Sequence, residues 1–226
     1  MIYLDHRSID LNQEEIISRL PREASFDGIK NYVNKAMKVI NLASVYKPAF
    51  IEERDKNSIN LGGVWFTSRV LTLNLESVER IFPYVITCGH EFDETAASMD
   101  ILDRYYLDVV ANTMLRLGQD KLRQIIQEKY LINKTSRMNP GSLQDWPLEQ
   151  QKQLFSLLGD EDLFRQLRVS LTDSYMMLPQ KTVAGLIYPT ESTFESCQLC
   201  DRENCPQRRA PYDEEKVKKY FYAANS

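Results

Sequence analysis

The sequence predicts an α+β fold: a single domain in which helices pack on a twisted mixed or antiparallel sheet, followed by a cysteine-containing C-terminal tail. Three observations predict it. Hydrophobic residues make up 43% of the 226 residues, which is enough for a sizeable core. Apolar residues recur with helical spacing over long segments, of which 93–130 is the longest. Short runs of β-branched and aromatic residues between these segments are typical of strands. We expect the domain to cover residues 1–190 and the tail to cover 191–226.

Two helices are predicted before the first strand. The first spans residues 12–20, where Asp10 is placed to cap it and Pro21 ends it. The second begins at Ser25 and follows helical spacing to about Tyr46, where a Lys-Pro pair stops it.

The middle of the chain is predicted to contain strands and one long helical region. Residues 49–54 and 58–75 are rich in β-formers, and 83–91 has the composition of a buried strand. The helical region covers 93–130, and Gly118 is expected to kink it or to split it in two.

The last third is predicted to begin with a loop and an amphipathic helix at 148–158. A polar connector at 160–166 leads to a strand that ends at Leu178. After Pro179, a second strand runs from Lys181 to Tyr188.

The loop before the helix at 148–158 is the best candidate for a binding site. Arg137 and Gly141 lie four residues apart in it. One guanidinium and exposed backbone N–H groups can hold a small anionic group. The alternative readings are a surface arginine paired with a nearby acid and a glycine that only serves a turn.

Composition and charge exclude several classes of protein. The net charge of −4 and the pI of about 5.4 give no basic face for nucleic acid. No apolar run approaches the ~18 residues of a membrane span, and the start MIYLDHRSID lacks the apolar core of a signal peptide. Four unevenly spaced cysteines do not suggest a disulfide scaffold. We therefore expect a cytoplasmic protein with reduced thiols, and neither a nucleic-acid nor a membrane partner.

Three ordered blocks, RMNPG, LTDSYMMLP and TVAGLIY, resemble the reactivation domain of cobalamin-dependent methionine synthase. In that family an Arg-x-x-x-Gly loop is followed by a Thr-Glu-Ser-aromatic strand, a proline and a Ser-Val-Ser-Gly strand. The stretch VITCGHE and the helices after it are a weaker match to the middle of the same domain. The matching residues are Arg137, Gly141, Thr172, Asp173, Ser174, Tyr175, Pro179, Val183 and Gly185.

The resemblance implies a ligand and the residues that hold it. Domains of this family bind S-adenosylmethionine and present its methyl group to a corrinoid whose cobalt has been oxidised to Co(II). By this resemblance Arg137 would pair with the ligand carboxylate, and the backbone at Asn139 and Gly141 would contact the ligand. Two positions depart from the family. Asn112 aligns with a ligand-contacting glutamate, and Ser142 replaces an aromatic residue.

The resemblance also implies a partner. Ser142, Trp146 and Tyr175 would face the corrinoid, with Trp146 replacing the missing aromatic residue. The chain has no Asp-x-His-x-x-Gly motif, so the cobalamin would be carried by a separate corrinoid protein or methyltransferase. The leading function is thus a stand-alone accessory protein that reactivates or reductively methylates that cobalamin, with an electron donor protein supplying the electron. The alternative is a non-catalytic module that binds a corrinoid protein and carries a structural metal tail. A Rossmann-type methyltransferase is disfavoured, because no Gly-rich loop follows a first strand.

The tail has a C-x2-C-x4-C array formed by Cys197, Cys200 and Cys205. Thiols at this spacing can converge on one ion, and either an iron–sulfur cluster or zinc would suit them. Three thiolates leave a fourth position, for which Cys88 is a candidate. The alternatives are incidental or structural tail thiols and a Cys88 that is simply a small buried hydrophobe.

Overall fold

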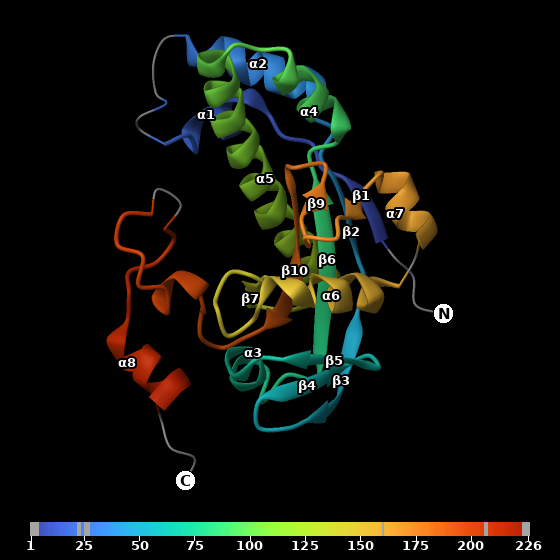
Figure 1. Ribbon diagram of the computed structural model, residues 1–226, viewed down its shortest axis with the longest axis vertical. Helices are drawn as coiled ribbons and strands as arrows, with labels where there is room; N and C mark the ends of the chain where they lie inside the picture. Colours follow the sequence, from blue (N-terminus) through green and yellow to red (C-terminus); the bar gives the residue numbers. More distant parts are fainter. Residues whose placement is uncertain (1–4, 22–23, 25–27, 160, 206–207, 223–226) are drawn as a thin grey trace.

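An antiparallel sheet forms the centre of the computed structural model, which describes residues 5–21, 24, 28–159, 161–205 and 208–222 (Figure 1). Eight strands pair in this sheet, and two more form a separate hairpin. The strands are β1 (Asp5–Ser8), β2 (Ala43–Tyr46), β3 (Ala49–Arg54), β4 (Ser58–Leu61), β5 (Val64–Thr67), β6 (Arg80–Thr87), β7 (Thr135–Met138), β8 (Ser170–Leu171), β9 (Met177–Leu178) and β10 (Thr182–Pro189).

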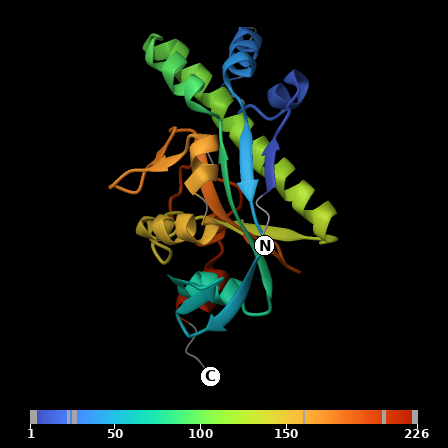
Figure 2. The same cartoon turned by 90° about the vertical axis from the view of Figure 1, so that its right-hand side faces the viewer.

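Helices lie on both faces of the sheet. They are α1 (Gln13–Ser18), α2 (Ile29–Val39), α3 (Arg69–Asn74), α4 (His90–Ala97), α5 (Ile101–Tyr130), η2 (Leu148–Gln150), α6 (Gln151–Leu158), α7 (Glu161–Leu167), η3 (Ser196–Gln198), α8 (Glu214–Val217) and η4 (Lys218–Tyr222). The longest, α5, runs obliquely across the sheet (Figure 2). The predicted α+β class is confirmed. In the part of the chain that the structure describes, no helix is both long and apolar enough to cross a bilayer.

The middle of the sheet is the pair β6 and β10. They run antiparallel, from Thr182 opposite Thr87 to Ile187 opposite Phe82. On the far edge of β10 lies β7, and on the far edge of β6 lie β2 and then β1. The start of β6 also pairs with β3, which leads into a meander through β4 and β5.

Two hydrophobic cores lie on opposite faces of this pair. Ile81 and Val85 of β6 enter the core that α6 covers. Phe82, Tyr84 and Ile86 alternate with them and enter the core formed with α1, α2, α4 and α5. Because β6 is covered on both faces, its sequence is an almost continuous apolar run rather than an alternating one.

Helix α5 is not split at Gly118, as the sequence had suggested, but runs unbroken through it. The glycine permits a close approach of the helix to the sheet. A Cβ atom added at Gly118 would lie 2.7 Å from Ile86 Cδ1 and closer still to Leu42 Cδ2. The absence of a side chain therefore sets the distance between α5 and β6, and with it the width of the site described below.

We expect Gly118→Leu to destabilise the protein by ~3 kcal/mol or more, because a well-packed core cannot accept the added carbons. Gly118→Ala should have a smaller effect, since two flexible side-chain ends can shift and the helix gains ~1 kcal/mol of intrinsic propensity. Urea unfolding of both variants measures this. Wild-type stability in Gly118→Leu would contradict the close packing.

The first two helices differ from the sequence-based expectation. The N-cap of α1 is Asn12 rather than Asp10, and its side chain accepts the Glu15 backbone N–H at 2.8 Å. The second predicted helix is too long at its end. The residues up to Tyr46 form β2 instead, where pairing with β6 buries three of its four residues. The predicted start at Ser25 lies outside the described residues.

Three other predicted segments were wrong in whole or in part. Residues 58–75 form strands only as far as Thr67, as β4 and β5, and then form α3, because the Ser68 side chain accepts a backbone N–H at 2.9 Å and caps a helix. The connector at 160–166 contributes to α7. The strand predicted to end at Leu178 is the hairpin of β8 and β9, whose turn holds Tyr175 at φ +62°.

The tail packs against the rest of the chain. Phe194 and Leu199 are buried in the core on the α6 face. Near the C-terminus, Arg69 Nε of α3 donates to the Tyr220 carbonyl at 2.7 Å. The division into a domain and a tail stays a prediction, but these contacts place the tail beside the site.

Candidate functional site

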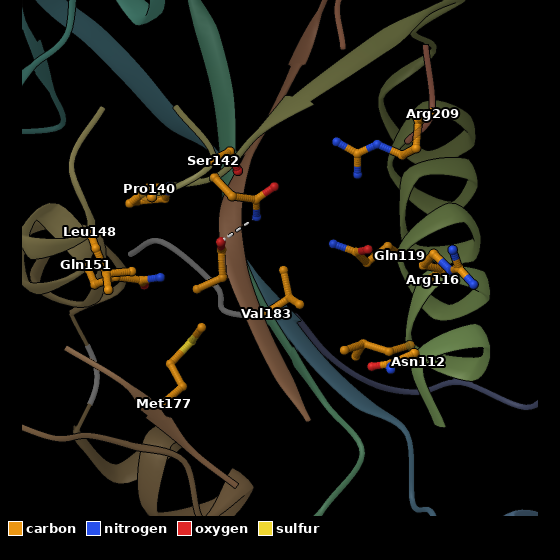
Figure 3. A pocket seen from close by; sticks show the side chains of 14 residues that line it. Asn112, Arg116, Gln119, Pro140, Ser142, Leu148, Gln151, Met177, Val183 and Arg209 are labelled. Carbon is orange, nitrogen blue, oxygen red and sulfur yellow. Dashed lines mark hydrogen bonds between the residues drawn. The ribbon is translucent and has the colours of Figure 1, made fainter. Parts of the chain in front are cut away.

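A pocket of about 390 Å³ opens between α5 and the loop that follows β7 (Figure 3). This volume is within the ~300–1,000 Å³ range of small-molecule sites. Helix α5 forms one wall, the loop and α6 form the opposite wall, and β10 lies between them. The lining residues are Asn112, Leu115, Arg116 and Gln119 of α5, Asn139, Pro140, Gly141 and Ser142 of the loop, Leu148, Gln151, Met177, Val183, Ala184 and Arg209.

A buried tyrosine connects the two walls. Tyr84 of β6 is completely buried, and its hydroxyl accepts Gln119 Nε2 at 2.9 Å from α5 and Asn139 Nδ2 at 3.1 Å from the loop. The Asn139 amide also donates to the Ala184 carbonyl of β10 at 2.5 Å. The network fixes both amide side chains at the base of the pocket, which is what a preorganised polar site requires.

Gly185 makes this network possible. A Cβ atom added there would lie 2.5 Å from the Met138 carbonyl oxygen and closer still to Asn139 Nδ2. Only a residue without a side chain allows β10 to pass this close to the end of β7. Gly185, which belongs to the third family-like block, therefore permits the close packing of β10 against β7 next to the pocket.

The loop after β7 is held by its own backbone and by its neighbours. Gly141 has φ +81°, and its N–H donates to the Trp146 carbonyl at 2.7 Å. Asp145 accepts the Val70 N–H at 2.9 Å and so holds the loop to the first turn of α3. Gln150 pairs with the backbone of Thr67 on β5. The loop is thus held in place by hydrogen bonds to α3 and β5 as well as by its own backbone.

The pocket contains an unsatisfied polar atom. Gln151 is 2% exposed, and its Oε1 has no hydrogen-bond partner within the described chain. An unpaired buried carbonyl oxygen typically costs ~1–3 kcal/mol. A ligand that donates a hydrogen bond, such as an amino or hydroxyl group, would remove that cost.

The charge of the pocket is positive. Among its described lining residues, Arg116 and Arg209 are the only charged ones, and no carboxylate accompanies them. Burial and then the neighbouring Arg209 and Arg137 lower the pKa of Arg116, although arginine stays protonated in proteins. Arg209 pairs with Glu195 through Nε at 2.8 Å. The α5 end of the pocket therefore suits an anionic group such as a carboxylate.

Asn112 is fixed by two charged neighbours. Its Nδ2 donates to Asp108 at 2.9 Å, and its Oδ1 accepts Lys181 Nζ at 3.0 Å. Lys181 also forms an ion pair with Asp108 at 2.6 Å. The amide thus lines the pocket and brings no charge of its own, and its contact with a ligand stays a prediction.

Arg137 is not in the loop but in β7, and it does not line this pocket. It is 4% exposed, and its Nη1 pairs with Asp120 at 3.2 Å. Its side chain lines a smaller cavity of about 210 Å³ beside the first, and the two cavities share Arg116 and Arg209. Of the four residues predicted to bind the ligand, the structure brings Asn112, Asn139 and Gly141 together and places Arg137 behind them.

The three residues expected to face a corrinoid lie in different environments. Ser142 lines the pocket. Tyr175 is in the turn between β8 and β9, with Lys152 Nζ 5.1 Å from its ring centre. Trp146 is completely buried and packs edge-on against Phe66, 6.1 Å between ring centres. Contact between Trp146 and a partner would require this core to open, so here it supports the loop.

Cys88 is enclosed on the α5 face of the sheet, while the tail packs through Leu199 on the opposite face. Its Sγ lies 4.0 Å from the Ala111 carbonyl. Burial raises the pKa of the Cys88 thiol to about 12. Since metals bind the thiolate, this environment suits a small buried hydrophobe better than a ligand.

The raised pKa predicts a loss of stability at alkaline pH. The unfolded chain releases the Cys88 proton near its ordinary pKa of 9.0, whereas the folded chain keeps it up to about 12. Stability is therefore fully present below pH ~9 and falls above it, by up to ~1.4 kcal/mol per pH unit from this group. We expect the unfolding free energy of wild type to fall more steeply between pH 9 and 11 than that of Cys88→Ala. Equal slopes would contradict the buried thiol.

The tail thiols lie on a loop organised by Arg208. Its guanidinium donates to the carbonyls of Cys197 at 2.9 Å and Cys200 at 3.1 Å, and the Arg209 N–H donates to Cys197 Sγ at 3.5 Å. Within the residues described, all four cysteines are free, and no three His, Cys, Asp or Glu side chains are grouped to hold a metal ion. This arrangement does not by itself fit a cluster or zinc, so the metal site stays a prediction.

Of the comparisons with known proteins, the one with solved structures finds a match. No protein-family model and no curated protein sequence matches the chain. Among solved structures, that of the MetH reactivation domain bound to AdoHcy is similar over 97% of this chain and 89% of that chain, with a TM-score of 0.57 and 15% sequence identity. The chain has the fold of that domain. The expectation of fold that came from three short sequence blocks is confirmed over nearly the whole chain.

Several pocket residues were not predicted from the sequence. Leu115, Arg116 and Gln119 follow the predicted Asn112 at helical spacing on one face of α5, and this spacing was the available signal. Tyr84 gave no signal, because a tyrosine in an apolar strand is usually a core residue. For Arg209 the sequence suggested two other roles, to balance the charge of a metal cluster or to dock an acidic partner.

Proposed function

We propose that this protein binds an S-adenosyl compound in the pocket between α5 and the loop after β7, and that it acts as a counterpart of the MetH reactivation domain. The observation that carries the proposal is the pocket itself. It has the size of a small-molecule site and a preorganised polar base, and it lies in a fold shared with a domain solved with AdoHcy.

The chemistry of the walls suggests how the ligand lies. Leu115, Leu148 and Met177 offer apolar surface for the adenine and the thioether chain. The unpaired Gln151 Oε1 can accept a hydrogen bond from the nucleoside. At the α5 end, the guanidinium of Arg116 is the natural partner for the carboxylate, since bidentate arginine–carboxylate pairs are strong.

Asn139, Gly141 and Asn112 would complete the contacts. Asn139 and Gly141 belong to the loop that lines the pocket, and the missing side chain at Gly141 leaves room for Leu148 of the opposite end of that loop, whose Cδ1 would lie 2.9 Å from an added Cβ atom. Arg137, predicted to bind the carboxylate directly, would act from the adjoining cavity by adding positive charge behind Arg116. This placement changes the role of Arg137 from the one the family resemblance implied.

The chain would contribute positioning rather than acid–base chemistry. S-adenosylmethionine supplies an activated methyl group, and the cobalt of a separate corrinoid protein, after reduction by one electron, would accept it. The methyl–sulfur bond breaks with its electron pair left on sulfur. Residues of the pocket need only hold the sulfonium in line and exclude water, which is worth several kcal/mol of barrier. Ser142 and Tyr175 are proposed to face the corrinoid.

The partners follow from this chemistry. The chain would act in the cytoplasm on a corrinoid-binding protein or methyltransferase, with a separate electron donor. We also propose, from the C-x2-C-x4-C spacing alone, that Cys197, Cys200 and Cys205 bind an iron–sulfur cluster or zinc. The proposed metal site is tested on anaerobically purified protein by its metal content and visible absorption. Cys200→Ser is the control. No step of the methyl transfer depends on it.

The experiment for the function uses the full chain, a corrinoid protein in the Co(II) state, a reductant and methyl-labelled S-adenosylmethionine. We expect label to appear on cobalt only when the chain is present, and Val183→Phe, which fills the pocket from β10, to slow the transfer. Transfer at the same rate without the chain would refute the proposal.

A second function is favoured by the charge of the pocket. Two arginines and no carboxylate, among the described lining residues, suit neutral AdoHcy better than the cationic sulfonium. The chain would then be a non-catalytic module that binds a corrinoid protein and responds to the ligand. In the same assay this function predicts a complex with the corrinoid protein and no transfer of label.

A further inference from the structure

The smaller cavity beside the ligand pocket is lined by four arginines from four parts of the fold. Its volume is about 210 Å³. We call it the arginine pocket and define it by Arg19 after α1, Arg116 of α5, Arg137 of β7 and Arg209 of the tail. Thr113, Leu117 and Asp120 complete its lining.

Positive charge exceeds negative charge in the arginine pocket. Asp120 is its only described carboxylate, and it serves Arg137 at 3.2 Å and the neighbouring Arg123 at 3.8 Å. Arg209 has a carboxylate partner in Glu195, which lies outside the lining. Arg116 is bonded, through Nη2, to the Thr113 hydroxyl at 3.4 Å.

One buried donor is also left without a partner. The side chain of Arg137 is 5% exposed, and its Nε has no hydrogen-bond partner among the described residues. A buried cation with an unused N–H group is costly unless an anion reaches it. Burial and neighbouring guanidinium groups lower the pKa of Arg116, and burial and Arg137 lower that of Arg123, in accord with uncompensated positive charge.

We propose that the arginine pocket is a second binding site, which takes a tetrahedral oxyanion such as phosphate or the phosphate group of a phosphomonoester. Guanidinium forks match phosphate oxygens bidentately, and four arginines line this cavity. The cavity is smaller than the ~300 Å³ at which sites for drug-sized ligands begin, so it suits the anion and a few waters rather than a nucleoside.

The bound anion would connect four segments that are distant in sequence. Arg19 belongs to the N-terminal helices and Arg209 to the tail, while Arg116 and Arg209 also line the larger pocket. Occupancy would therefore hold the tail against α5 and fix two side chains of the ligand site.

Calorimetry with inorganic phosphate tests the site, with chloride at the same ionic strength as reference. Arg19→Gln is the informative variant, because Arg19 is exposed and lines only the arginine pocket of the two. Arg104→Gln makes the same charge change on an exposed position of α5 and is the control. We expect saturable phosphate binding that Arg19→Gln weakens by at least ~tenfold and Arg104→Gln leaves unchanged. Binding no stronger than that of chloride, or equal binding in Arg19→Gln, would overturn the proposal.

A second titration separates this site from the ligand pocket. In the presence of saturating AdoHcy, the dissociation constant for phosphate should change by less than ~threefold, because each guanidinium has donors for both groups. Competitive displacement of phosphate by AdoHcy would show that the arginine pocket is the carboxylate end of the first site, and would overturn the proposal. If AdoHcy does not bind at all, the proposed function fails while the phosphate result still stands.

Discussion

Gly185→Ala is expected to abolish binding of the S-adenosyl ligand and to destabilise the fold by ~3 kcal/mol. The added methyl group would meet the Met138 carbonyl oxygen and the Asn139 amide, and backbone at that position cannot rotate away as a side chain can. Either β10 separates from β7 or Asn139 leaves its place on Tyr84 and Ala184. Both movements change the base of the pocket.

Urea unfolding and ligand calorimetry on the same preparation measure these effects. Gly63→Ala is the control, because no atom lies within 4 Å of a Cβ atom added there. Since Gly63 has φ +84°, this control should lose ~1 kcal/mol of stability for backbone reasons alone and keep its ligand affinity. Unchanged affinity in Gly185→Ala would mean that the pocket does not depend on the close strand packing.

Tyr84→Phe is expected to lower ligand affinity by ~tenfold or more and stability by ~1–3 kcal/mol. The phenyl ring fills the same buried space, so the change removes only the oxygen that accepts Gln119 and Asn139. Gln119 is then left with an unpaired buried donor, and Asn139 keeps only its bond to the Ala184 carbonyl. Both amides lose the geometry that makes the pocket preorganised.

The control for Tyr84→Phe is Tyr105→Phe, on the exposed start of α5. We expect this change to alter neither stability nor affinity measurably. If Tyr84→Phe loses stability but binds the ligand as wild type does, the hydroxyl is structural and the network does not position the ligand.

Individual helices and strands could be predicted from their local sequence patterns. The helical spacing of 93–130 predicted α5 but joined it to the end of α4, and the spacing of 148–158 predicted η2 with α6, because one face of each is apolar. The buried run at 83–91 predicted part of β6 without its topology, but the strand begins earlier, at Arg80, and ends at Thr87. The blocks around Arg137, Pro179 and Gly185 predicted the fold, which the similarity to a solved structure confirms.

The predictions that failed concern residues whose structure is decided by contacts between elements. The residues up to Tyr46 have helical spacing, yet they form β2 because β6 offers a paired edge. Arg137 was expected in the ligand pocket, but strand pairing with Ile187 directs it toward Asp120 in the adjoining cavity. No local pattern could reveal that Tyr84 joins the two walls, since its partners lie 35 and 55 residues away in the chain.

The most direct test of the central claim is calorimetric titration of the full chain with AdoHcy and with S-adenosylmethionine, for wild type and Val183→Phe. We predict one binding site per chain that Val183→Phe closes while its unfolding free energy shows that the fold is retained. No heat from wild type at ~1 mM of either ligand, which corresponds to a binding free energy weaker than about −4 kcal/mol, would contradict it.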